Sequence, residues 1–179
     1  MMIDLSRTPE DAEVTEAYGT DWWHGENEDE QVLALDAPLE VNVRIRRAGN
    51  KYILDGRMAG GIQVRCDRCL EPFHREVKAP FHLFLQALPS GPNAAEVELL
   101  DEDMEVDFIH GDQVNLDEIV REQVFLSLPL KCLCSETCRG LCPVCGGNLN
   151  RGVCTCRRGE GHPAFSKLKE LKTDDHRGE

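Results

Sequence analysis

Hydrophobic and polar residues alternate along much of the chain between residues 39 and 85, and a period of two predicts β-strands. Leu39, Val41, Val43 and Ile45 alternate with polar side chains, as expected for a strand with one buried face. The turns between such segments contain glycine. The predicted order is a strand at 39–46, a turn at 48–50, a strand at 51–58, a turn at Gly60-Gly61, a strand at 62–66, and a long strand at 73–85 bent near Pro80.

The pattern changes to helical spacing after residue 115. Asn115 is a candidate helix N-cap with Glu118 at the third helical position, and Pro129 ends the helix. A last strand is predicted just before it, at 105–110. The short turns between the strands favour an antiparallel meander over an alternation of strands and helices.

Both ends of the chain carry weaker patterns. Residues 9–31 are rich in Glu and Asp and show little periodicity, which indicates an acidic arm that Trp22 and Trp23 anchor to the body. Near the other end, Phe165, Leu168 and Leu171 follow helical spacing among lysines. They predict a short amphipathic helix that is marginal by itself and needs a surface to pack on.

The chain has 179 residues, a net charge of -13 and nine cysteines. No stretch approaches ~20 consecutive apolar residues, so no membrane span is expected. The first residues have neither a basic nor an apolar region of the kind that directs export, so we expect a protein of the reducing cytoplasm. In such a compartment, clustered cysteines are more often metal ligands than disulfides.

The net charge is unevenly distributed. Residues 1–43 carry -11 and residues 96–122 carry -10, whereas residues 44–78 carry +5 and residues 130–179 carry +3. All nine cysteines lie in the two basic segments. The basic residues either decorate solvated strand faces or form a functional basic face, and the pattern alone leaves both interpretations open.

Eight of the cysteines form four close pairs. Cys142-x2-Cys145 and Cys154-x-Cys156 are separated by eight residues, and Pro143, Gly146 and Gly147 suit a tight turn around the first pair. Zn²⁺ prefers four thiolates in a tetrahedron, and a two-residue spacer lets one turn supply two of them. Residues 142–156 therefore predict a self-contained zinc site, with iron–sulfur, redox-active or unliganded thiols as alternatives.

The other two pairs, Cys66/Cys69 and Cys134/Cys138, have no local partner pair. We expect them to meet in space around a second zinc ion that ties the strand corner to the chain after the helix. The alternative is that Cys66 and Cys69 are buried as small hydrophobic residues. Cys132 is left over, and it competes with Cys134 as a candidate ligand.

These observations predict an α+β fold: an antiparallel β-meander plus a helix, with a C-terminal zinc-ribbon-like cysteine module. We divide the chain into an acidic N-terminal arm at 1–30, an antiparallel β domain with its helix at 31–129, a zinc-knuckle module at 130–158, and a short tail helix with a disordered end at 159–179. Closed four-thiolate sites are structural, and no catalytic motif accompanies them, so we expect no enzymatic activity and no small-molecule substrate.

The cysteine motifs resemble those of a known family. Asp67-Arg68-Cys69-Leu70, directly after Cys66, resembles the Cys-x-Arg-Cys-Leu signature of the YceD family, bacterial and chloroplast proteins named for large ribosomal RNA subunit accumulation. The succession from residue 128 to residue 156 resembles the distal half of that family, except that proline is common there in place of Cys132. The resemblance implies a role in producing or stabilising 23S ribosomal RNA during large-subunit assembly, without known catalysis.

Three hypotheses about partners follow. The first is an rRNA-binding factor that contacts phosphates through arginines near the cysteines: Arg65, Arg68, Arg139, Arg151, Arg157 and Arg158. The second is an adaptor whose acidic segments bind a basic large-subunit ribosomal protein. The third is a thiol or zinc redox switch centred on Cys132, which the sequence supports least.

Overall fold

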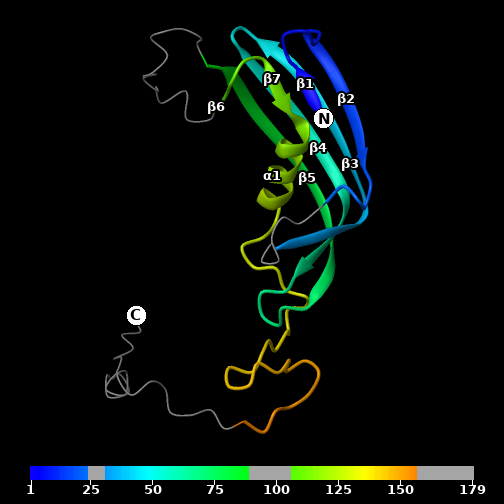
Figure 1. Ribbon diagram of the computed structural model, residues 1–179, viewed down its shortest axis with the longest axis vertical. Coiled ribbons are helices and arrows are strands. Elements are labelled where there is room, and N and C mark those ends of the chain that lie inside the picture. Colours follow the sequence, from blue (N-terminus) through cyan, green and yellow to red (C-terminus); the bar gives the residue numbers. More distant parts are fainter. Residues whose placement is uncertain (24–30, 89–105, 157–179) are drawn as a thin grey trace, which may run out of the picture.

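The computed structural model describes residues 1–23, 31–88 and 106–156. Its centre is a five-stranded sheet with the order β2-β3-β4-β5-β6. The strands are β2 (Asp11–Tyr18), β3 (Val32–Ala48), β4 (Lys51–Arg65), β5 (Pro72–Ala87) and β6 (Val106–Ile109). As Figure 1 shows, β3, β4 and β5 are long and curved, and the cysteine-bearing segment continues beyond one end of the sheet.

The strands β2 to β5 form an antiparallel meander, and the sequence predicts the part of it from β3 to β5. The last predicted strand is also present as β6, but it pairs in parallel with β5 through residues 84–87 and 106–109. Residues 88–105 separate the two strands, which is long enough for the chain to re-enter the sheet in the same direction. The predicted meander covers only the strands before β6, so the direction of this strand is a finding of the structure.

The predicted turn at Gly60-Gly61 is also wrong, because both glycines lie inside β4, one continuous strand. They sit opposite a part of β3 where the register shifts three times between Val32 and Glu40. A Cβ atom on Gly60 would lie 2.7 Å from the carbonyl oxygen of Pro38. The glycines thus allow two backbones to approach closely at irregular pairing, rather than reversing the chain.

One face of the sheet is covered by the helix α1 (Leu116–Leu126) and by a two-stranded sheet of β1 (Met2–Asp4) and β7 (Gln113–Asn115). Asn115 caps α1 as predicted, because its Oδ1 accepts the backbone N–H of Asp117 at 3.1 Å. The helix buries the apolar face that its spacing indicates. The core combines this face with the inward side chains of β3 and β4: Val120, Val124, Leu39, Val41, Val43, Ile45, Leu54 and Ile62.

The N-terminal acidic segment contains a strand that the sequence did not predict. In β2 the outward residues are mostly polar, but the inward ones are Ala12, Val14, Glu16 and Tyr18, which give only a weak period of two. Tyr18 holds β2 to α1 by donating its hydroxyl to Asp117 Oδ1 at 3.0 Å. Trp22 and Trp23 pack on the core, which agrees with the predicted anchoring to the body.

The predicted tail helix at 163–172 lies outside the described residues, and the four-part division of the chain stays a prediction. Among residues 1–23, 31–88 and 106–156, no helix is long and apolar enough to cross a membrane.

Candidate metal centres

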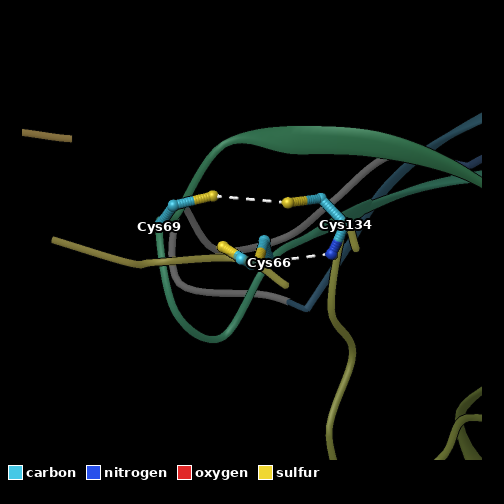
Figure 2. A group of neighbouring side chains, drawn as sticks. Cys66, Cys69 and Cys134 are labelled. Atoms are coloured by element: carbon cyan, nitrogen blue, oxygen red, sulfur yellow. Dashed lines mark hydrogen bonds between the residues drawn. The ribbon is translucent and has the colours of Figure 1, made fainter. Parts of the chain in front are cut away.

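Four cysteines that are distant in sequence meet at the end of the sheet. Cys66 follows β4, Cys69 lies in the turn before β5, and Cys134 and Cys138 lie after α1; their sulfur atoms are all within 4.8 Å of one another. The Sγ atoms of Cys66 and Cys138 are 3.8 Å apart, and those of Cys69 and Cys134 are 3.7 Å apart. Figure 2 shows Cys66 and Cys69 at the corner between β4 and β5, with Cys134 facing them from the segment after α1.

These distances suit a metal rather than a disulfide. A disulfide needs an S–S separation of about 2.0 Å. Four sulfurs at about 2.3 Å from a central Zn²⁺ in a tetrahedron stand about 3.8 Å from each other, close to both observed separations. We call these four residues the bridging cluster, because they join the β4–β5 corner to the segment after α1.

Residues 142–156 form the second group, which we call the local cluster. The sulfurs of Cys142, Cys145, Cys154 and Cys156 also lie within 4.8 Å of one another. The two groups of four coincide with the two predicted ligand sets. They supply only soft sulfur donors, which suits zinc, and all four positions of a tetrahedral ion would be filled by protein.

The same backbone turn presents the first two cysteines of each cluster. The N–H of Leu70 donates to Cys66 O at 2.9 Å, and the N–H of Gly146 donates to Cys142 O at the same distance. Leu70 has φ 59° and Gly146 has φ 71°, both in the left-handed region. Gly146 adopts this conformation without steric cost, whereas Leu70 adopts it as a non-glycine residue.

Donors directed at the sulfurs support ionised thiols. In the bridging cluster, the Cys134 N–H donates to Cys66 Sγ at 3.4 Å, and the Asn150 side-chain amide donates to Cys138 Sγ at 3.2 Å. In the local cluster, the Val144 N–H donates to Cys142 Sγ at 3.4 Å. Such second contacts orient metal-bound thiolates and disperse their charge.

The thiols of each cluster differ widely in acidity. Burial would raise the pKa of Cys66, but N–H donors from Cys134, Cys69 and Arg68 outweigh it and lower that pKa to about 6. Desolvation, followed by the neighbouring thiols, raises the pKa of Cys134 to about 12. Close thiols cannot all ionise without a cation among them, and a divalent metal supplies that charge.

The local cluster repeats this contrast. The N–H groups of Cys145 and Val144 lower the pKa of Cys142 to about 6. Contact with the Cys145 thiol raises the pKa of Cys156 to about 12. Each cluster therefore contains thiols with a lowered pKa, which ionise readily, and thiols with a raised pKa, which need a positive neighbour to do so.

Cys134 rather than Cys132 belongs to the bridging cluster. Cys132 is 1% exposed and packs in the main hydrophobic core. Its backbone is paired with Asp67, whose N–H donates to Cys132 O at 2.8 Å and whose Oδ2 accepts the Cys132 N–H at 2.6 Å. This double contact turns the Cys132 side chain into the core and positions Cys134, two residues later, at the cluster.

Some supporting residues were not identified from the sequence. Asp67 fixes the chain at Cys132, and Asn150 binds both Cys138 Sγ and the Arg139 N–H. Asn148 donates to Glu71 Oε1 at 3.2 Å. This contact joins the segment that carries the local cluster to the β4–β5 corner, which carries Cys66 and Cys69. In the sequence, the one indication of these roles is that the residues lie beside the cysteine pairs. Their hydrogen-bond partners lie up to 77 residues away, so no local pattern connects them.

Three of the predicted RNA-binding arginines surround the bridging cluster. Arg68 donates to Cys138 O at 2.9 Å, and its own carbonyl accepts the Leu141 N–H at 3.1 Å. The Arg139 N–H donates to Asn150 Oδ1 at 2.8 Å. Arg151, which follows Asn150 in the sequence, forms an exposed ion pair with Glu71 at 2.9 Å. Arg65 lies at the end of β4, and Arg157 and Arg158 lie outside the described residues. Their binding to RNA stays a prediction.

Comparison with known proteins gives matches that cover most of the chain. A protein of Mycobacterium tuberculosis described as uncharacterised is 29% identical over 158 residues, which cover 83% of this chain and 72% of that protein. Chloroplast proteins of Zea mays and Arabidopsis thaliana, named large ribosomal RNA subunit accumulation protein YCED homolog 1, are 27% and 25% identical. They match over 67% and 75% of this chain and 49% of their own length.

No solved structure matches the chain. The family model described as large ribosomal RNA subunit accumulation protein YceD matches residues 54–172, which include β5, α1 and all eight cysteines of the two clusters. The sequence motifs, the meeting of Cys66 and Cys69 with Cys134 and Cys138, and this match agree: the chain belongs to the YceD family.

Proposed function

We propose that this protein supports the accumulation of 23S ribosomal RNA in the cytoplasm by binding precursor rRNA, without catalysing a reaction. The family match and the names of the plant relatives support the role in large-subunit rRNA. The observation that carries the binding proposal is the bridging cluster, because arginines from two distant parts of the sequence make contacts beside it.

In this proposal zinc occupies both clusters. It neutralises part of the thiolate charge and fixes the segment from Cys138 to Asn150 against the β4–β5 corner, which carries Cys66 and Cys69. The approach is close, since a Cβ on Gly140 would lie 2.9 Å from Arg68 O. This packing keeps Arg68, Arg139 and Arg151 beside the bridging cluster, through the contacts of Arg68 with Cys138 O, of the Arg139 N–H with Asn150, and of Arg151 with Glu71. Guanidinium groups suit phosphate, and an exposed arginine ion pair exchanges its carboxylate for phosphate at little cost.

Binding to a 23S rRNA fragment tests this proposal. Affinity should fall as salt rises, and replacing Arg68, Arg139 and Arg151 by Ala should reduce the slope of log affinity against log salt by about 0.7 per lost phosphate contact. Arg44→Ala with Arg46→Ala is a matched control, because these arginines pair with Asp11 and Asp55 on the sheet. An affinity that ignores salt, or a control that weakens binding as much, would contradict the proposal.

The cellular role is tested in a strain that lacks its own YceD protein. Expression of the wild-type chain should restore the level of 23S rRNA, and the triple arginine variant should restore less of it. Failure of the folded wild-type chain to restore 23S rRNA would refute the role itself, whichever partner it binds.

A further inference from the structure

The end of α1 exposes large apolar side chains that the rRNA proposal does not use. Phe125 is 40% exposed and Leu126 is 68% exposed, and Leu130 four residues later is fully exposed. We call these three residues the α1 apolar end. Single exposed apolar residues are ordinary, but three of them within six positions make this segment a candidate binding surface.

One of the three residues, Phe125, is held in place by the core. The ring of Phe125 lies 5.5 Å from the ring of Trp23, which is buried in the core. The Arg121 guanidinium lies over both tryptophans, 5.2 Å from the Trp22 ring and 5.1 Å from the Trp23 ring. A side chain that is already ordered, as Phe125 is, loses little conformational entropy when it binds a partner.

The charge beside the patch identifies the chemistry of its partner. Glu118, Glu122 and Leu126 follow one another at intervals of four and therefore share one exposed face of α1. The last turn of α1 contains no basic residue, and the guanidinium of Arg121 is directed to the tryptophans. Lys131 is the one basic residue between 122 and 138. The face is acidic at one end and apolar at the other.

We propose that this face of α1 binds a basic, apolar segment of a large-subunit ribosomal protein. Two carboxylates repel phosphate, so the face does not suit RNA, and a second copy of a chain with net charge -13 would be repelled as well. An amphipathic segment with Lys or Arg beside apolar side chains complements both halves of the face. The choice of a ribosomal protein rests on the proposed function; the face and its basic, apolar partner do not.

The experiment uses the zinc-loaded full chain. The probe is the total protein of purified large ribosomal subunits, stripped of RNA by lithium chloride and nuclease. Proteins that the full chain retains are identified by mass, and the affinity of the full chain for each is then measured with the purified protein. Leu126→Ser with Leu130→Ser should weaken the affinity for the retained protein by about tenfold or more. Glu118→Gln with Glu122→Gln should weaken it at low salt and have little effect at high salt.

Val144→Ser with Val153→Ser is the matched control, because both valines are exposed apolar residues in the local cluster's segment. It should bind as the wild type does, and all variants should keep the wild-type melting temperature and metal content. The inference is overturned if no basic ribosomal protein is retained, if retention needs RNA, if the three double variants bind equally, or if the wild-type chain forms dimers through this face. It is also overturned if Leu126 and Leu130 are already protected from labelling in the wild-type chain alone.

The rRNA assay separates this inference from the proposed function. If the wild type restores 23S rRNA and the Leu126→Ser, Leu130→Ser variant restores it equally well, the docking inference fails and the proposed function stands. If the wild type restores nothing while the direct binding differences are found, the proposed function fails and the docking site stands.

Discussion

Replacement of Cys134 by Ser should weaken zinc binding at one site, whereas replacement of Cys132, two residues earlier, should leave zinc binding unchanged. The Cys134 sulfur lies 3.7 Å from Cys69 Sγ in the bridging cluster, and the Cys132 sulfur lies in the core, 4.0 Å from Pro129 O. Zinc binding to a structural four-ligand site is worth about 10–16 kcal/mol, or about 2.5–4 kcal/mol for each ligand. Cys134→Ser should therefore lower zinc affinity at the bridging cluster by two to three orders of magnitude.

Cys132→Ser changes stability instead. It places a hydroxyl in an apolar site without a close acceptor, which costs about 1–3 kcal/mol. Zinc content by native mass spectrometry, competition with a chromophoric chelator, and urea denaturation measure the two effects separately. If Cys132→Ser loses a zinc ion and Cys134→Ser keeps both, the assignment of the fourth bridging ligand is wrong.

Three further predictions concern the sheet, the aromatic support of α1 and the acidity of the thiols. Gly60→Ala should destabilise the fold by about 1–3 kcal/mol in urea denaturation, because the new Cβ would meet the backbone at Pro38. As a control, Gly152→Ala should change stability by less than about 0.5 kcal/mol, because nothing lies within 4 Å of its Cβ position. Equal effects of the two substitutions would contradict the close approach of β3 and β4. Arg121→Gln should lower stability by about 0.5–2 kcal/mol and alter tryptophan fluorescence, since the guanidinium lies over two indole rings, and an unchanged spectrum would contradict this contact. Zinc binding to the bridging cluster at pH 7 should release at least two protons, because the pKa values of Cys69 and Cys134 are both raised above 9.0. The zinc affinity should therefore increase with pH, and an indicator dye reports the released protons. A zinc affinity that does not change between pH 6 and pH 8 would count against this.

The cysteine clusters could be predicted from the sequence because their pairs are local. Two cysteines separated by two residues share one turn, and this holds for Cys66-x2-Cys69 and Cys142-x2-Cys145 wherever they lie in the fold. The pairing of Cys66 and Cys69 with Cys134 and Cys138 followed from elimination, since the local cluster needed no further ligand. The sequence left Cys132 and Cys134 undecided, because the choice depends on the contact of Cys132 with Asp67, 65 residues away.

The strands show the corresponding limits of pattern reasoning. Glycine signals a turn and close backbone packing alike, so Gly60-Gly61 suggested a chain reversal that the bulged pairing of β3 with β4 does not contain. The edge strand β2 has Ala12 and Glu16 among its inward residues, and its period of two was too weak to recognise. The direction of β6 depends on the connection from β5, and no local pattern determines it.

Metal content of the full chain tests the central claim most directly, namely that one four-cysteine site joins the sheet to the C-terminal module and a second lies within that module. Native mass spectrometry of the zinc-loaded protein should find two zinc ions per wild-type chain. It should find one in the Cys66→Ser, Cys69→Ser variant and one in the Cys154→Ser, Cys156→Ser variant. A single ion in the wild type, or two ions that survive in either variant, would contradict the two-site account.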